Sequence, residues 1–247
     1  MSSGGGGEVL TGLAAEISSL SPILWLRGDD ASGDLTDYGS RGVDAVLTQG
    51  AVTYNAVSGP DSTSYVNFSD EDYFQVPDAA DLEIDNVTGT TFCVAYRPES
   101  FTQRAGSFFS KSDAAGGRSY YIRQRYGVDE IRVLRFQDDD FSVYSEYRID
   151  TNPALNTWHF LIVRFNTDGT TSLWQDTTTE GAVQQTAPTG TAQTDSTAPL
   201  TFGSGTGTNS GADVDGTVAH WAIFDSALSD VQCEDLMQAA IDEGWTE

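Results

Sequence analysis

The chain has very little lysine and lacks any long apolar run. Only Lys111 among its 12 basic residues is a lysine, whereas 37 residues are acidic, and the net charge at pH 7 is -25. A surface of this charge repels nucleic acid and anionic membranes, so we expect neither as a partner. No segment approaches the roughly 20 apolar residues that cross a bilayer, so we expect no membrane insertion.

Cysteine and histidine are also scarce. Two cysteines cannot build a disulfide framework. We interpret Cys93, in a predicted strand, and Cys233, in a predicted helix, as small core residues, with a bridge between them as the alternative. His159 and His220 are the only histidines, and neither has another His or Cys at metal-ligand spacing. His159 begins a predicted strand, and we interpret it as structural.

Catalytic motifs are absent as well, since the chain contains no GxSxG and no P-loop. Glu83-Ile-Asp85 resembles the start of the E-x-D-x-x-E catalytic strand of jelly-roll β-glucanases. A retaining glycosidase needs two carboxylates about 5–5.5 Å apart. The third acid of that motif would fall at Thr88, which has no carboxylate. We therefore predict no catalytic residues and no enzymatic activity, and the alternative to a catalytic strand is a solvated loop.

Short apolar segments separated by Gly, Asn, Asp and Ser run through most of the chain. This spacing favours an all-β sandwich of two sheets over alternating strands and helices. At 247 residues, one such domain accounts for the whole length. Residues 177–198 show little periodicity and predict a long loop with a short edge strand. The clearest predicted strands are 23–27, 64–68, 73–76, 91–97, 106–111, 118–126, 130–137, 141–148, 158–166, 170–175 and 199–203.

The C-terminal region shows a strand followed by a helix. Residues 218–224 alternate in the period-2 pattern of a strand that is buried on both faces. Ser229 and Gln232 form an S-x-x-Q capping box, and Leu228 and Cys233 occupy the hydrophobic staple positions on either side of the cap. A helix is therefore predicted to begin directly after Ser229.

The N-terminal region, residues 1–20, is predicted to be an arm followed by a short helix. Val9, Leu13, Ile17 and Leu20 lie on one helical stripe. Two interpretations stay open: the stripe folds back on the sandwich, or it is an anchor that docks on a partner. The first seven residues do not have the pattern of a secretion signal. The remaining residues, 21–247, form the predicted sandwich domain.

Several of these segments resemble one family. The run from Asp215-Gly216 to Asp230 resembles the closing strand and trailing helix of laminin-G-like (concanavalin A-like) jelly rolls. The resemblance covers roughly residues 20–241 and implies an all-β, two-sheet jelly-roll β-sandwich with a short N-terminal helix and a C-terminal helix. The other segments that carry it, in the family's order, are 20–30, 37–44, 65–68, 73–77, 108–111, 156–159 and 199–203.

The sequence around Leu20-Ser-Pro22 is similar to that of bacteriophage virion proteins that carry this domain. It implies a non-catalytic virion structural protein, made in the host cytoplasm and displayed on the particle surface as a head decoration, fibre or tail accessory. Its expected partners are other virion proteins, further copies of itself in a homo-oligomer, and host surface glycans. The alternative is a carbohydrate-binding, lectin-like module of a bacterial extracellular protein.

The resemblance also implies a calcium site, since calcium takes six to eight oxygen ligands. The matching acids are Asp37, Asp44 and Asp215. Asp29, Asp30 and Asp213 could contribute. The chain departs from the family at His220, where relatives often carry an acid. The alternative is a solvated acidic rim without metal.

Arginine and tyrosine gather in one part of the chain. Five of the eleven arginines lie between Arg118 and Arg135. By alternation, Tyr121, Arg123 and Arg125 share one strand face. Together with Arg132 they are our candidate contact surface for a neighbouring subunit or an anionic glycan, because Arg and Tyr are enriched at interfaces. The alternative is a salt-bridged sheet face.

Overall fold

The structure is a computed structural model that describes most of the chain, and the side chains of 118, 125 and 183–186 lie outside the description. The described residues are 10–69, 72–100, 106–112, 118–125, 130–137, 144–149, 153–181, 183–186, 196–204 and 214–246.

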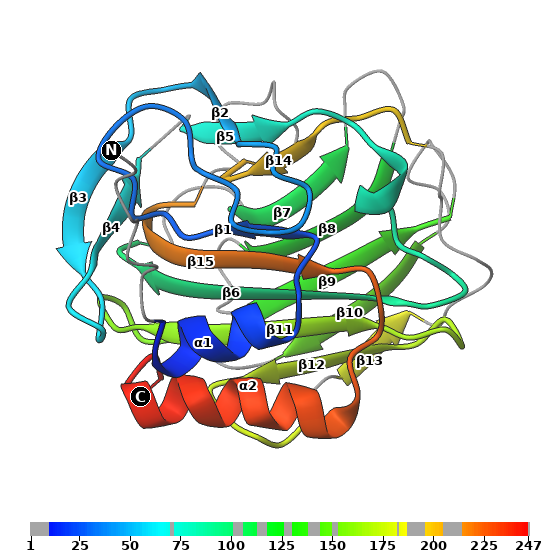
Figure 1. Cartoon of the computed structure of the whole chain (residues 1–247). Helices are drawn as coiled ribbons and strands as arrows, with labels where there is room; N and C mark the ends of the chain where they lie inside the picture. Colours follow the sequence, from blue (N-terminus) through cyan, green and yellow to red (C-terminus); the bar gives the residue numbers. More distant parts are fainter. Residues whose placement is uncertain are drawn as a thin grey trace, which may run out of the picture.

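Two antiparallel sheets face one another across the core, as the predicted sandwich requires (Figure 1). The 7-stranded sheet has the order β12-β11-β6-β15-β4-β3, with β1 also paired to β15. Its strands are β1 (Leu24–Leu26), β3 (Thr53–Ser58), β4 (Ser64–Phe68), β6 (Thr90–Pro98), β11 (His159–Phe165), β12 (Thr171–Gln175) and β15 (Gly216–Phe224).

The 8-stranded sheet has the order β13-β10-β9-β8-β7-β14-β5-β2. Its strands are β2 (Val46–Gln49), β5 (Tyr73–Val76), β7 (Ser107–Ser112), β8 (Arg118–Arg125), β9 (Glu130–Phe136), β10 (Tyr144–Ile149), β13 (Val183–Thr186) and β14 (Leu200–Phe202). Strands far apart in sequence are neighbours in both sheets, which is the jelly-roll arrangement.

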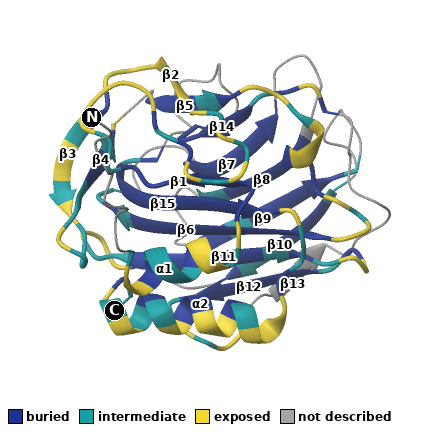
Figure 2. Cartoon of the chain, in the orientation of Figure 1, coloured by how far each residue is buried: buried dark blue, intermediate teal, exposed yellow. Residues whose placement is uncertain are grey.

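Two helices lie side by side against the outer face of the 7-stranded sheet (Figure 1). They are α1 (Gly12–Ser19) and α2 (Asp230–Glu243), and a short 3₁₀ helix, η1 (Ala80–Leu82), precedes β6. Within the described chain, no helix is both long and apolar enough to span a bilayer. The helices bury the outer face of β6, β11 and β15, and Figure 2 shows these strands as buried.

The core therefore has two layers. The first lies between the sheets and is rich in Phe, Ile, Val and Leu. The second lies between the 7-stranded sheet and the helices, where Leu13 and Ile17 of α1 meet Leu236 and Met237 of α2. Cys93 and Cys233 also lie in this second layer as free, buried thiols, so our interpretation of them as core residues is confirmed.

Every residue of β15 is buried, which confirms the prediction of a strand covered on both faces. Its alternation is interrupted, because the register against β6 shifts between Val218 and His220. This bulge places Val218 in the inner core with Trp221, whereas Ala222 packs under the helices. The strict alternation read from the sequence is thus wrong at Val218 and Ala219, since a bulge adds one residue to one strand of a pair.

The start of α2 also follows the sequence. Ser229 Oγ accepts from the Gln232 backbone N–H at 3.2 Å, and Gln232 Oε1 accepts from the Ser229 backbone N–H at 2.9 Å. Leu228 and Cys233, the staple pair, are both buried. The predicted strands are present with small shifts at their ends. β2 and β3 were not predicted, because these edge strands are largely exposed and carry no apolar alternation.

Candidate functional site

A cleft of about 580 Å³ lies at the end of the sandwich where β6 begins and β15 ends. This volume falls within the range of roughly 300–1,000 Å³ that small-molecule sites occupy. Its walls come from η1, from the segment between η1 and β6, and from the residue after β15. The lining residues are Ala80, Asp81, Glu83, Ile84, Asp85, Asn86, Val87, Thr88, Thr90 and Asp225.

Asp85 shapes the turn that forms one wall. Its Oδ1 accepts from the backbone N–H groups of Val87 at 2.6 Å and Thr88 at 3.2 Å, and its Oδ2 accepts from the Thr88 hydroxyl at 2.7 Å. These bonds lower the pKa of Asp85. Gly89 completes the turn at φ +75, where a Cβ would stand 2.6 Å from the Phe165 carbonyl oxygen. Asp85 is therefore a turn-forming carboxylate that is ionised at neutral pH.

Glu83 lies at the base of the cleft. Its side chain is 4% exposed, and its Oε1 stands 3.0 Å from Nζ of Lys111, the chain's single lysine. Burial raises the pKa of Glu83, and the ammonium of Lys111 opposes that rise. Lys111 is completely buried and also donates to the Ala198 carbonyl at 2.7 Å and to Asp78. Glu83 and Lys111 thus form a buried ion pair whose charges compensate each other.

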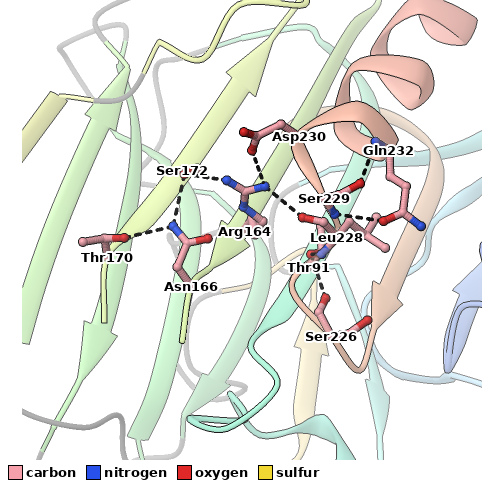
Figure 3. A network of polar contacts seen from close by, with 10 residues as sticks. All are labelled: Thr91, Arg164, Asn166, Thr170, Ser172, Ser226, Leu228, Ser229, Asp230 and Gln232. Carbon is pink, nitrogen blue, oxygen red and sulfur yellow. Dashed lines mark hydrogen bonds and ion pairs between the residues drawn. The ribbon is translucent and has the colours of Figure 1, made fainter. Parts of the chain in front are cut away.

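Asp225 is followed by a turn that a polar network holds in place (Figure 3). The Thr91 hydroxyl donates to the Ser226 carbonyl at 2.9 Å and accepts from the Leu228 N–H at 3.0 Å. Arg164 donates to the Leu228 carbonyl at 2.8 Å and to Asp230 at 2.7 Å. The turn between β15 and α2 is therefore held to the 7-stranded sheet.

The arrangement suits binding more than catalysis. Glu83 is paired inside the protein, Asp85 is engaged by its own turn, and the third motif position is Thr88, whose hydroxyl contacts Asp85. Residues 83–88 form a turn between η1 and β6 and not the strand that the glycosidase motif requires, as in the solvated-loop alternative. The sequence drew attention to this segment but missed Asp81 and Asp225. Asp225 lies in the closing run of the family resemblance, whereas Asp81 gave no signal.

Of the three predicted calcium ligands, the structure brings Asp37 and Asp44 together in one loop and leaves Asp215 apart from them. Asp37 Oδ1 accepts from the N–H groups of Trp25 at 2.9 Å and Gly39 at 2.7 Å, and its Oδ2 accepts from Val43 N–H at 3.1 Å. Asp44 Oδ1 accepts from the Asp37 N–H at 2.9 Å. Both oxygens of Asp37 and one oxygen of Asp44 are thus engaged in folding their own loop, a role that needs no metal.

Asp215 lies far from this loop. Leu26 pairs with both Asp37 and Trp221, whereas Asp215 precedes the first residue of β15. Along an extended strand, the distance from Trp221 back to Asp215 is roughly 20 Å. Across the described residues, no group of three or more His, Cys, Asp or Glu is arranged to hold a metal ion. Asp213 lies outside the described residues.

The arginine–tyrosine surface is largely a salt-bridged sheet face, the alternative that the sequence left open. Arg132 Nε donates to Glu146 Oε1 at 2.8 Å, and Arg148 also pairs with Glu146. Tyr121 is 3% exposed and donates to the Ser112 hydroxyl at 2.8 Å. The Arg123 guanidinium lies over the Tyr121 ring at 5.5 Å. The side chain of Arg125 lies outside the description.

The N-terminal stripe folds back on the chain's own sandwich, one of the two interpretations above. Leu13 and Ile17 are fully buried in the layer under α2, and Leu20 packs against that layer. Leu13 and Ile17 are therefore not exposed for a partner, while Val9 lies outside the described residues. His159 is structural, as expected, because it is 3% exposed and its Nδ1 lies 2.6 Å from Asp176 Oδ2.

Comparison with known proteins agrees with this fold. Domain 4 of AbnA, a GH43 extracellular arabinanase from Geobacillus stearothermophilus solved in complex with arabinotriose, superposes with a TM-score of 0.67 at 17% identity, covering 88% of this chain and 98% of that domain. The receptor binding domain of botulinum neurotoxin C/D mosaic serotype gives 0.66 at 15% identity, covering 90% of this chain and 52% of that one. The binding domain of botulinum neurotoxin serotype D gives 0.65 at 16% identity, covering 92% and 53%.

The chain thus spans about half the length of the two toxin domains. At these identities the likeness shows a shared fold. No curated protein matches the chain in sequence. Residues 68–232 match the family Laminin_G_3, described as the Concanavalin A-like lectin/glucanases superfamily. Because that match covers more than half of its length, the chain belongs to the Concanavalin A-like lectin/glucanases superfamily.

Proposed function

We propose that this chain is a non-catalytic carbohydrate-binding module and that its glycan site is the cleft between η1, the turn of Asp85 and Asp225. The observation that carries the proposal is the cleft of about 580 Å³, bordered by carboxylates, an amide and hydroxyl groups. Similar folds in other proteins are named as an arabinanase domain in complex with arabinotriose and as toxin receptor-binding domains.

The chemistry of the lining favours a sugar. Sugar hydroxyls donate hydrogen bonds, and the carboxylates of Asp81 and Asp225 and the carbonyl of Asn86 accept them. Val87 adds apolar surface, because its side chain is prominently exposed. Polar groups held in place around a small apolar surface are the usual composition of a small-molecule site.

A blocking substitution tests the site. Ala80 is exposed and lines the cleft, so Ala80→Trp should fill the cleft without disturbing the core. Ala154→Trp is the matched control, because Ala154 is exposed and precedes Asn156, whose N–H donates to Pro98 at the far end of β6. Binding of arabino-, gluco- and galacto-oligosaccharides would be measured by calorimetry and on a glycan array.

We expect wild type and Ala154→Trp to bind at least one neutral oligosaccharide and Ala80→Trp to lose that binding at an unchanged melting temperature. Equal binding by both variants would move the site away from the cleft, and no binding by wild type to any glycan would refute the function. We also expect no hydrolysis of β-glucans in reducing-sugar assays, because Thr88 supplies no second catalytic carboxylate.

We further propose that the module is displayed on a phage particle as a head decoration, fibre or tail accessory, assembled with other virion proteins and as a homo-oligomer. The resemblance around Leu20-Ser-Pro22 and the net charge of -25, which suits an exposed particle surface, favour this setting over a bacterial extracellular protein. Mass spectrometry of gradient-purified particles should detect the chain at a fixed copy number. Its absence from the particles would refute the setting but leave glycan binding intact.

A further inference from the structure

We infer that the cleft selects neutral glycans and rejects anionic ones such as sialylated, sulfated or uronic-acid sugars. This inference rests on the proposed function and names the ligand class of the same site. It differs from the sequence-based prediction that Tyr121, Arg123, Arg125 and Arg132 contact an anionic glycan. Its basis is the distribution of charge around the cleft.

The lining of the cleft carries negative charge and no compensating cation of its own. Among the described lining residues, four are acidic and none is basic. The charge of Glu83 is balanced by Lys111, and Asp81 pairs with Arg41. Asp85 is held ionised by the bonds of its turn. The net effect is a negative rim on a protein whose total charge is already -25.

Asp225 is the least compensated of these carboxylates. Its backbone carbonyl accepts from the Thr88 hydroxyl at 2.9 Å. Within the part of the chain that the structure describes, its side chain makes no hydrogen bond or ion pair, and the residue is exposed. It is therefore a charge that a bound sugar meets directly, either as an acceptor for hydroxyl groups or as a repulsive partner for an acid.

The described cations near the cleft are already engaged. Arg41 pairs with Asp81, and Lys111 with Glu83. Arg135 is 2% exposed and donates to the Gly169 carbonyl at 2.8 Å and to Asn86 Oδ1 at 2.5 Å. An anionic sugar in the cleft would have to displace one of these bonds to find a counter-charge.

Arg132 and Arg148 on the sheet face offer no better receptor. Arg132 and Arg148 share the carboxylate of Glu146, which is 3% exposed. A sialic acid or sulfate there would compete with an ion pair that is already largely out of water. Such pairs are costly to break, because the group left behind is a buried, uncompensated charge.

Matched ligand pairs provide the test. Neutral oligosaccharides bound by wild type would be compared with the same oligosaccharides carrying one sialic acid, sulfate or uronic acid, at low and at 0.5 M salt. Two unit charges a few ångströms apart in a partly solvated site should weaken the anionic member by about tenfold or more at low salt. Added salt should reduce this difference in affinity between the neutral and anionic ligands, since it screens exposed charges.

Asp225→Asn supplies the discriminating variant, because it removes the charge and keeps a hydrogen-bonding side chain of the same size. We expect it to reduce, several-fold, the ratio of the affinity for the neutral ligand to the affinity for the anionic ligand. Glu234→Gln is the control, an exposed carboxylate of α2 outside the cleft lining, and it should leave the ratio unchanged.

The outcomes separate the two proposals. Anionic ligands that bind as tightly as their neutral counterparts, or more tightly, overturn the charge selectivity while glycan binding stands. The same holds if Asp225→Asn and Glu234→Gln change the ratio equally. If no ligand of either class binds wild type, the proposed function falls and the selectivity with it.

Discussion

The carboxylate of Glu243 accepts a hydrogen bond at 2.9 Å from the backbone N–H of Leu13, 230 residues away in sequence. The same oxygen accepts from the indole N–H of Trp245 at 2.9 Å. The end of α2 is thus tied to the first turn of α1, where a negative charge is favourable. Gly12 leaves room for this contact, because a Cβ at that position would lie 2.2 Å from Glu243 Oε1.

This relationship predicts that Glu243→Ala destabilises the protein by about 2–4 kcal/mol, because two N–H donors lose their acceptor. Trp245 is fully buried, so water cannot replace the lost bond at its indole without local opening. Urea unfolding measures the loss. Asp242→Asn is the matched control, since Asp242 is exposed and accepts from the exposed Gln238 one turn earlier, and its change should stay within about 0.5 kcal/mol. Equal effects of the two substitutions would contradict the tie.

The sequence predicted the elements whose signal is local. The capping box of Ser229 and Gln232 needs only four consecutive residues, and it is present with both reciprocal bonds. The strand 64–68 is correct to the residue because its Tyr, Val and Phe face the two core layers. The edge strands β2 and β3 escaped prediction because their residues are largely exposed to solvent. The choice between a folded-back and a docking N-terminal helix depended on α2, more than 200 residues away.

Asp37 provides a prediction about calcium. Asp37→Asn should lower the free energy of unfolding by about 1–3 kcal/mol. Both carboxylate oxygens of Asp37 accept hydrogen bonds from backbone N–H groups, and in the variant an amide nitrogen would face one of these donors. Since this role needs no metal, the drop in melting temperature should be the same in 2 mM calcium and in EDTA. Calorimetric scans under both conditions measure it. A wild type that melts lower in EDTA, next to a variant that does not respond, would instead restore the calcium site at Asp37.

Glu146 provides a prediction about the arginine face. Burial raises its pKa, but hydrogen bonds from Arg132 and Arg148 outweigh burial and hold the pKa below its ordinary value. Stabilisation from this group is therefore present above its unfolded-state pKa and is lost as pH falls through the lower folded-state pKa. Glu146→Gln should destabilise the protein at pH 7 by about 3–5 kcal/mol, because two arginines lose a shared partner.

Arg123→Ala is the comparison for that face. Arg123 stacks over Tyr121 and is only partly buried, so its loss should cost less than that of Glu146. Urea titrations of both variants at pH 7 decide the order. A larger loss for Arg123→Ala would mean that the ring contact, and not the Glu146 cluster, stabilises this sheet face.

The candidate site was only partly predictable. The motif beginning at Glu83 drew attention to one wall of the cleft, and Thr88, which has no carboxylate, argued against a catalytic pair. The rim residue Asp225 is 137 positions from Thr88, and only the folding of β15 beside β6 brings the two together. The charge of Glu83, at the base of the cleft, is compensated by Lys111. Lys111 lies on β7 in the 8-stranded sheet, whereas β6 and β15 belong to the 7-stranded sheet. Contacts of this kind are set by strand order, which has no local signature.

His220 is the feature most sensitive to pH. It is 1% exposed and packs against the aromatic rings of Trp25, Tyr65 and Trp245, whose centroids lie 5.3–6.1 Å from the centroid of the imidazole. Among the described residues neither ring nitrogen has a hydrogen-bond partner. Burial lowers the pKa of His220 to about 3, and the nearby charges are Asp61, which raises it, and Arg27, which lowers it. The histidine is therefore neutral in the folded protein through the whole mildly acidic range.

The sign of its effect follows from linkage. Above pH 6.5 the side chain is neutral in both states and contributes no pH dependence. Below pH 6.5 the unfolded chain takes up a proton that the folded chain does not bind, so stability falls by up to about 1.4 kcal/mol per pH unit until pH approaches 3.

His220→Phe removes this proton uptake and sacrifices no hydrogen bond. The variant should therefore lose less stability than wild type between pH 7 and pH 4, and the gap should widen as pH falls. Urea unfolding at half-unit pH intervals measures the gap, with His220→Leu as a smaller apolar variant that should show the same slope even if its stability at pH 7 is lower. Parallel curves for wild type and both variants would show that His220 takes up a proton as readily in the folded state as in the unfolded state, and the lowered pKa would then be wrong.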